Sequence, residues 1–222
     1  MKKLFLFILC IAGAFGVSAQ LCKWSDAFRY AEDNKLLEHA PDVVFMGNSI
    51  TDLWYGSFPE FFTENNYAGR GISGQTTDQM LVRFRQDVIN LHPKVVVILA
   101  GINDIAENNG AVTDEYIVNN IASMCDLAKI NGIIPVLCSI CPCDHFVWRK
   151  ELQPAQRVIE VNKLIKVYAQ KSGLEYVNYH ALMADENGAM RPGLSKDRCH
   201  PTIKGYNIMM PAVQKVIKKL LK

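Results

Sequence analysis

Short apolar runs alternate along this chain with helical patterns, and this alternation limits the possible folds more than any other feature. Strand-like runs occur at residues 43–46, 67–68, 94–100, 133–140 and 175–179. Between them, apolar residues recur at intervals of three and four, as in helices that bury one face. Parallel strands require such crossover helices. The chain is therefore predicted to be an α/β protein: a three-layer α/β/α sandwich with a five-stranded parallel sheet of flavodoxin-like order 2-1-3-4-5.

Local signals predict where the helices begin and end. A first helix is expected over residues 24–40, followed by a helix that opens with a capping box at Thr76–Gln79. Thr113 is expected to cap the next helix, and Pro154 suits the first turn of another. Pro211 lies inside the last helical pattern, where it is expected to kink or divide the helix.

The first 19 residues have the pattern of a secretory signal peptide. Lys2 and Lys3 precede an apolar run at residues 4–16, and small residues follow at positions 17–19. The run is shorter than the roughly 20 residues that cross a membrane, so a cleaved leader is favoured over a membrane anchor. Cleavage is expected after Ala19, leaving residues 20–222 as a single secreted or periplasmic domain.

The charge balance argues against polyanionic partners. Once Lys2 and Lys3 are removed, 22 basic residues face 22 acidic ones, so the mature chain has no excess positive charge. Binding to nucleic acid or to an anionic membrane surface is not expected, nor is stable membrane insertion after cleavage. The oligomeric state is not fixed by these features.

Six cysteines remain after the predicted cleavage, which is compatible with disulfides in an exported protein. They are Cys22, Cys125, Cys138, Cys141, Cys143 and Cys199. Their pairing cannot be read from the sequence. A disulfide from Cys199 to the loop containing Cys141 and Cys143 is one hypothesis. A metal site is disfavoured, because no second Cys or His pair lies at ligand spacing.

Three predicted strands end in small polar residues, and in a parallel sheet these ends share one edge. Ser49 follows the first strand, Gly74 the second and Asn103 the third. Ser49 could be a helix N-cap or a nucleophile. A nucleophilic serine needs a base, and His200 has Asp197 three residues before it, close enough to orient the imidazole. The Gly74 N–H, the Asn103 amide and the Ser49 N–H are suitable donors to an oxyanion.

Four short blocks of this sequence resemble, in order, those of the SGNH (GDSL-type) hydrolases. They are Gly47-Asn48-Ser49-Ile50, Gly71-Ile72-Ser73-Gly74, Gly101-Ile102-Asn103-Asp104 and Asp197-Arg198-Cys199-His200-Pro201. The resemblance covers nearly the whole mature domain and is closest to the branch similar to platelet-activating-factor acetylhydrolases. One residue departs from the pattern: Asn48 stands where the family usually has aspartate.

The resemblance implies a serine esterase that forms an acyl-enzyme. Ser49 would be the nucleophile, His200 the base and Asp197 its partner, with Ser49, Gly74 and Asn103 as the oxyanion hole. No metal or organic cofactor is implied. The expected substrates are small-molecule or carbohydrate esters with short acyl groups such as acetyl. The alternatives are a lysophospholipase or thioesterase with longer acyl groups, and a catalytically silent glycan-binding module.

Overall fold

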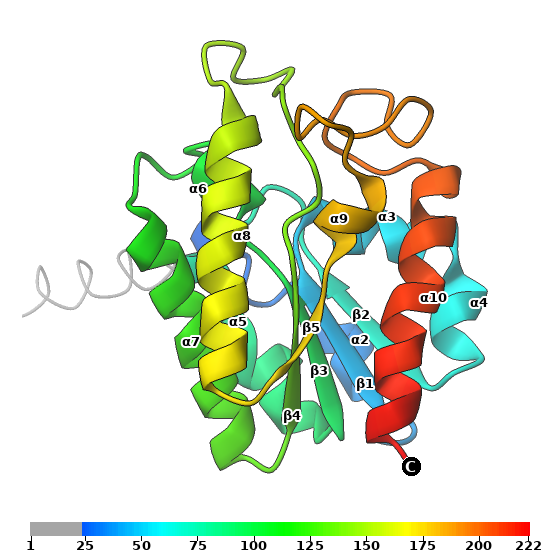
Figure 1. Cartoon of the computed structure of the whole chain (residues 1–222). Coiled ribbons are helices and arrows are strands. Elements are labelled where there is room, and N and C mark those ends of the chain that lie inside the picture. The colour runs from blue at the N-terminus through cyan, green and yellow to red at the C-terminus, as the bar shows by residue number, and fades with distance from the viewer. Residues whose placement is uncertain (1–23) are drawn as a thin grey trace, which may run out of the picture.

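The computed structural model describes residues 24–222, and its centre is a parallel sheet of five strands (Figure 1). The strands are β1 (Val43–Gly47), β2 (Tyr67–Gly71), β3 (Val95–Leu99), β4 (Ile134–Cys138) and β5 (Glu175–Val177). Their order is β2-β1-β3-β4-β5, which confirms the predicted topology. The predicted signal peptide and its cleavage point lie outside the described residues.

Helices cover both faces of the sheet and make the sandwich three layers thick (Figure 1). One face is packed by α5 (Thr77–Asp87), α7 (Asp114–Ile130) and α8 (Pro154–Lys171), and the other by α3 (Ser49–Ser57), α4 (Pro59–Thr63), α9 (Tyr179–Met183) and α10 (Ile203–Leu220). Along β1, Val44 and Met46 join the first core, whereas Val43 and Phe45 join the second. Because side chains alternate between the faces of a strand, this central strand must be apolar throughout.

The remaining elements are short: α2 (Ala31–Lys35), the 3₁₀ turn η1 (Ile89–Leu91) and α6 (Ile102–Ile105). The predicted capping box of α5 and the Thr113 cap of α7 are both present, and Pro154 lies in the first turn of α8. These local predictions succeed because a cap depends on neighbours within one helical turn.

Strand β2 is longer than predicted, because it continues through two glycines to Gly71. A Cβ atom on Gly71 would lie 2.2 Å from the backbone nitrogen of Asp52 in α3. A Cβ atom on Gly69 would lie 3.0 Å from the ring of Tyr55. The glycines therefore allow α3 to pack directly on the strand, a reason that sequence alone does not reveal.

One helix prediction was wrong, and one of the two outcomes predicted at Pro211 is excluded. The helix expected over residues 24–40 is reduced mainly to α2, and Asp26 has a left-handed φ of 45° that interrupts a continuous helix. The last helix is not divided: α10 runs through Pro211, which lies on its exposed side. Met209 and Val213 are fully buried on either side of the proline, so packing against the sheet maintains the helix across the missing hydrogen bond.

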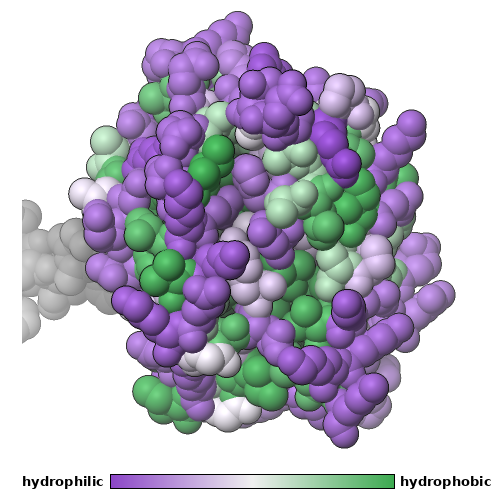
Figure 2. Space-filling view, in the orientation of Figure 1, coloured by the Kyte–Doolittle hydropathy of each residue, from purple (hydrophilic) through white to green (hydrophobic). Residues whose placement is uncertain are grey.

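The face shown in Figure 2 is largely hydrophilic, with smaller apolar groups between the polar side chains. Among residues 24–222, no helix is both long enough and apolar enough to cross a membrane.

Candidate active site

Ser49 begins α3 directly after β1 ends. The N-cap of this helix is Asn48, whose Oδ1 accepts a hydrogen bond of 3.2 Å from the backbone N–H of Ile50. The capping role that the sequence left open for Ser49 therefore belongs to Asn48. An aspartate or an asparagine can make this bond, so the departure from the family pattern preserves the cap. The Ser49 hydroxyl remains available for another partner.

That partner is His200, which is 151 residues away in the sequence. Ser49 Oγ lies 2.8 Å from His200 Nε2, and His200 Nδ1 lies 2.6 Å from Asp197 Oδ2. An ionised carboxylate only accepts hydrogen bonds, so Nδ1 carries a proton and Nε2 of the neutral ring can accept the serine proton. The three side chains thus form one continuous line of proton donors and acceptors.

A tight turn holds Asp197 in place. Its Oδ1 accepts hydrogen bonds from the backbone N–H groups of Cys199 (3.0 Å) and His200 (2.8 Å) and from the Ser195 hydroxyl (3.0 Å). Partial burial would raise the pKa of the Asp197 carboxyl, but the bonds from the His200 ring and these backbone groups outweigh it and lower the pKa to about 2. Asp197 therefore stays ionised at any pH near neutrality.

Asn103 and Gly74 lie near Ser49 in the same cavity. Asn103, which is 3% exposed, donates one amide hydrogen to the backbone oxygen of Gln75 at 2.9 Å. Gly74 adopts a φ of +82°, a conformation that suits glycine, and its carbonyl oxygen accepts from Asn108 Nδ2 at 3.1 Å. Ser49, Gly74, Asn103 and His200 line one cavity of about 400 Å³. Four of the five residues expected from the sequence thus line this cavity, and the fifth, Asp197, is bonded to His200.

A buried arginine beneath the cavity connects the strand ends. Arg83 is fully buried in α5 and forms an ion pair of 3.0 Å with Asp87. Its guanidinium also donates to the backbone oxygens of Gly47 (3.0 Å) and Arg70 (2.9 Å), and to Gln75 Oε1 at 2.6 Å. The residue before the Asn48 cap and the loop that carries Gly74 are therefore attached to the same side chain.

Asp104 attaches the next strand end to α5. Its carboxylate accepts hydrogen bonds from the Thr77 hydroxyl at 2.6 Å and from the Thr77 backbone N–H at 3.0 Å. Burial raises the pKa of Asp104 to about 6, although the bonds from Thr77 oppose this shift. Asp104 follows Asn103 directly, so this anchor also restrains the amide donor.

Sequence analysis did not identify Trp148 and Asn108 as residues of the site. The Trp148 ring centroid lies 6.0 Å from that of His200, and its Nε1 donates to Asn108 Oδ1 at 3.1 Å. Both residues line the cavity at Ser49. Their only sequence signal is an aromatic residue in the loop after β4 and an asparagine in the loop after α6, which is too common to be specific.

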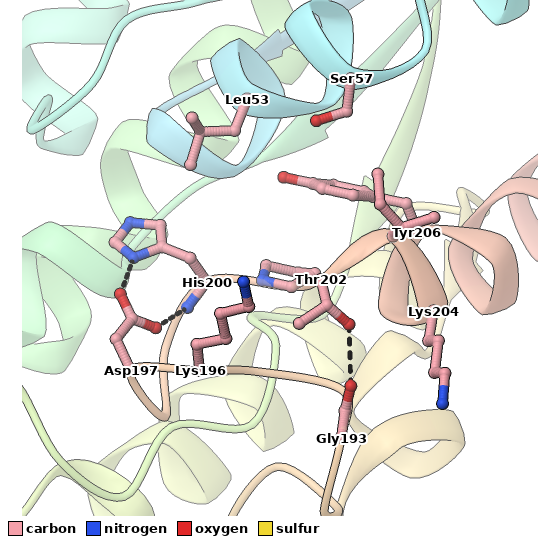
Figure 3. A pocket seen from close by; sticks show the side chains of 11 residues that line it. Leu53, Ser57, Gly193, Lys196, Asp197, His200, Thr202, Lys204 and Tyr206 are labelled. Carbon is pink, nitrogen blue, oxygen red and sulfur yellow. Dashed lines mark hydrogen bonds and ion pairs between the residues drawn. The ribbon is translucent and has the colours of Figure 1, made fainter.

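A second, larger cavity of about 610 Å³ lies beside His200 (Figure 3). It lies between α3 and the segment that leads into α10, and Leu53 and His200 line both cavities. The remaining lining residues are Ser57, Gly193, Lys196, Asp197, Pro201, Thr202, Ile203, Lys204 and Tyr206.

The described cysteines Cys125, Cys138, Cys141, Cys143 and Cys199 are buried free thiols, so the hypothesised disulfide at Cys199 is not present in this structure. A hydrogen bond with Cys143 and burial raise the pKa of the Cys199 thiol. The sulfur that Cys199 contacts thus lies in the loop that the sequence hypothesis named. Within residues 24–222, no cluster of three His, Cys, Asp or Glu side chains could hold a metal ion.

Comparisons with known proteins place this geometry in context. Residues 45–208 match the model of the GDSL-like Lipase/Acylhydrolase family. A crystal structure of a GDSL-like lipase from Bacteroides thetaiotaomicron is 46% identical, with a TM-score of 0.85 over 88% of this chain and 98% of that one. A structure described as a platelet activating factor from Streptococcus pneumonia is 19% identical, with a TM-score of 0.77 over 93% and 99% of the two chains, and shows a similar fold.

Two curated relatives align over shorter stretches. An acetylxylan esterase from Geobacillus stearothermophilus is 25% identical over 64% of this chain and 68% of its own length. The alignment with an uncharacterized lipoprotein of Bacillus subtilis, 33% identical, spans 32% of this chain and only 31% of that protein.

Proposed function

Since the chain belongs to the GDSL-like lipase/acylhydrolase family and is a serine ester hydrolase, we propose that it removes short acyl groups, such as acetyl, from a carbohydrate through an acyl-enzyme on Ser49. The observation that carries this proposal is the continuous contact from Ser49 through His200 to Asp197, at 2.8 Å and 2.6 Å. A serine hydroxyl becomes an effective nucleophile only when such a base is in place.

In the first half-reaction, Ser49 Oγ attacks the ester carbonyl carbon while its proton moves to His200 Nε2. The carbonyl oxygen becomes an oxyanion, and the imidazole becomes an imidazolium that the ionised Asp197 stabilises. When the tetrahedral intermediate collapses, the bond to the alcohol oxygen breaks. His200 Nε2 then returns its proton to that oxygen, which leaves an acyl group on Ser49.

The oxyanion hole proposed here consists of the backbone N–H groups of Ser49 and Gly74 and the side-chain amide of Asn103. The Ser49 N–H lies in the first turn of α3, where backbone N–H groups are free and the helix dipole favours negative charge. Asn103 has two amide hydrogens, and only one is used by the bond to the Gln75 oxygen. The other hydrogen is available to the oxyanion.

The second half-reaction uses water in place of the alcohol. His200 Nε2 removes a proton from water, and the resulting hydroxide attacks the acyl carbon. The second tetrahedral intermediate then releases the carboxylic acid, and the proton on His200 returns to Ser49 Oγ. The site regains its starting state, and every step uses only residues of this chain and water.

A preference for short acyl groups is supported by the cavity around Ser49. Trp148 and Leu53 flank a volume of about 400 Å³ that also contains the polar groups of Asn103 and Asn108. A long apolar chain would have to displace water from those polar groups without hydrogen bonding to them, which is unfavourable. The curated relative described as an acetylxylan esterase agrees with an acetylated carbohydrate as substrate.

We also propose that the mature protein is a single domain of residues 20–222, exported after cleavage at Ala19. The pattern in residues 1–19 supports this proposal. Amino-terminal sequencing of protein recovered from outside the cytoplasm should begin at Gln20. A protein that retains Met1 in that fraction would contradict the cleavage.

An ester panel tests the proposed activity. p-Nitrophenyl acetate, butyrate and longer esters are assayed with the wild type, Ser49→Ala, and Ser123→Ala as a control on the exposed face of α7. We expect the highest kcat/KM on acetate, its loss in Ser49→Ala and its retention in Ser123→Ala. A fluorophosphonate should label Ser49 in the wild type.

The alternatives predict different outcomes of the same panel. A preference for long esters would indicate a lysophospholipase or thioesterase, and the second cavity of about 610 Å³ is the feature that favours this option. Equal rates for the wild type and Ser49→Ala on every ester would exclude catalysis by Ser49 and favour the catalytically silent glycan-binding module.

A further inference from the structure

We propose that the larger cavity binds the alcohol part of the substrate, and that Lys196 selects alcohols carrying an anionic group, such as the carboxylate of a uronic acid. This inference rests on the proposed ester hydrolysis. It concerns lining residues of that cavity that take no part in the proposed catalytic cycle. We call the cavity lined by Leu53, Lys196, Pro201, Ile203 and Tyr206 the alcohol groove.

The proton transfer from His200 determines where the alcohol part of the substrate must bind. His200 Nε2 returns a proton to the alcohol oxygen, so this oxygen must lie beside His200 when the bond to the acyl group breaks. The carbonyl oxygen, in contrast, must point toward Gly74 and Asn103 on the other side of Ser49. Because His200 and Leu53 line both cavities, an ester bound at Ser49 can extend its alcohol part directly into the groove.

The walls of the groove suit an alcohol with an apolar face. Leu53 is 47% exposed and Ile203 is 53% exposed, so both present apolar surface to solvent. Pro201 also lines the groove, and the Tyr206 ring faces it (Figure 3). A sugar ring has such a face formed by its C–H groups, and burying it against these side chains is favourable.

The charge of the groove comes from Lys196. Figure 3 shows its side chain rising into the space between His200 and Thr202, whereas Lys204 points away from it. Lys196 has no ion-pair partner within residues 24–222, although nearby Arg198 is paired with Asp144. The one acidic lining residue is Asp197, and its oxygens already bind His200, Cys199 and Ser195.

An unpaired ammonium beside an apolar wall favours a ligand that combines an apolar face with a negative charge. A neutral acetylated sugar would leave this ammonium without a partner, whereas a carboxylate on the same ring could pair with it. The pair would be open to solvent, so its effect should be modest and should decrease as salt is added.

The test compares matched acetate esters at low ionic strength: O-acetylated methyl glucuronoside and O-acetylated methyl glucoside. The wild type should show a kcat/KM for the anionic ester that is roughly two- to fivefold higher. Lys196→Met should bring the ratio to one, and Lys196→Glu should invert it. Lys204→Met, which removes the charge of a lining residue whose side chain extends away from His200, should preserve the preference.

Two further conditions make the outcome specific. Raising the salt concentration should reduce the wild-type ratio toward one, and O-acetyl glycerol phosphate identifies whether a phosphate is preferred to a carboxylate. A wild-type ratio of one at low salt would overturn the proposal, as would equal losses in Lys196→Met and Lys204→Met. Failure of the proposed ester hydrolysis can be distinguished from failure of the Lys196 preference. In the first case the wild type would cleave neither p-nitrophenyl acetate nor the two sugar esters.

Discussion

The two sides of Ser49 are built in different ways. On the oxyanion side, Asn103 is 3% exposed and Asp104 is 1% exposed, and both follow a central strand of the sheet. On the other side, the side chains of His200 and Asp197 are 24% and 31% exposed, and they lie on an irregular turn between α9 and α10. The proposed donors are held by the core, whereas the proposed base is held by a few local bonds.

This contrast suggests a division of structural roles. Buried hydrogen bonds hold the segments that carry the proposed oxyanion donors: Arg83 donates to the Gly47 oxygen, and the Asp104 carboxylate accepts from the Thr77 N–H. The same contacts therefore serve both geometry and stability. The turn depends on Asp197, which bonds to the backbone of its own neighbours and to the imidazole. We therefore expect changes in the turn to affect catalysis more than folding, and changes beneath the donors to affect both.

The largest effect is expected in the turn. His200→Ala should reduce kcat by up to about 10⁶-fold, because Ser49 loses the base that accepts its proton. Its urea midpoint should change little, since the side chain is partly exposed. Steady-state kinetics and urea unfolding measure both effects, with His39→Ala as a control on the exposed surface before β1. A large loss of stability in His200→Ala would contradict the division described above.

The second largest effect, a loss of stability, is expected at the buried Arg83. Arg83→Met should lower the free energy of unfolding by about 3–5 kcal/mol, because Asp87 stays buried without its cation. Arg85→Met is the matched control, since Arg85 lies on the exposed side of the same helix. Urea unfolding compares the two variants. Equal stability of Arg83→Met and the wild type would mean that the buried ion pair is dispensable.

Removing one of the proposed donors should lower kcat rather than raise KM. Asn103→Ala is expected to lower kcat by about 10²–10³-fold, because the oxyanion loses a hydrogen bond in the transition state, while KM changes little. Asn119→Ala, on the exposed surface of α7, is the control. An increase in KM with kcat unchanged would indicate that Asn103 binds the substrate instead.

The contributions of Asp197 and Asp104 to stability should change with pH in opposite directions. The Asp197 pKa is lowered to about 2, so its contribution to stability is present above about pH 4 and is lost as the pH falls toward 2. The Asp104 pKa is raised to about 6, so the unfolded state ionises first and stability is lost as the pH rises from about 4 to 6.

Urea unfolding of the wild type, Asp104→Asn and Asp197→Asn between pH 3 and pH 7 tests this pair. Relative to Asp104→Asn, the wild type should lose on the order of 2 kcal/mol between pH 4 and pH 6. Relative to Asp197→Asn, it should gain stability as the pH rises from 3. Parallel curves for all three proteins would show that neither carboxyl has the environment described here.

The smallest effect is expected at Trp148, which contacts both His200 and Asn108. Trp148→Phe keeps an aromatic ring beside His200 but removes the hydrogen bond to Asn108, which in turn contacts Gly74. The loss of one such bond should lower kcat/KM by roughly 2- to 12-fold. Trp24→Phe serves as the control, and an equal loss in both variants would exclude a specific role for Trp148.

Much of the fold could be predicted from local patterns. Apolar runs and helical periodicity indicate five strands, their helices and the parallel order, because each signal lies within one element. The caps at Thr76 and Thr113 are equally local. Gly69 and Gly71 were misread as loop residues, since only the packing of α3 on β2 explains them.

The residues proposed for catalysis were found from four short blocks and their order, and the sequence by itself determined that they share one edge of a sheet. Only the tertiary structure decided that Asn48, not Ser49, caps α3, and that Arg83 links the strand ends. It also decided that Trp148 faces His200 and that Lys196 lines a groove. The physical reason is the separation of the interacting residues along the chain. Caps and periodicity depend on near neighbours in the sequence, whereas burial and cavities depend on residues brought together from distant segments.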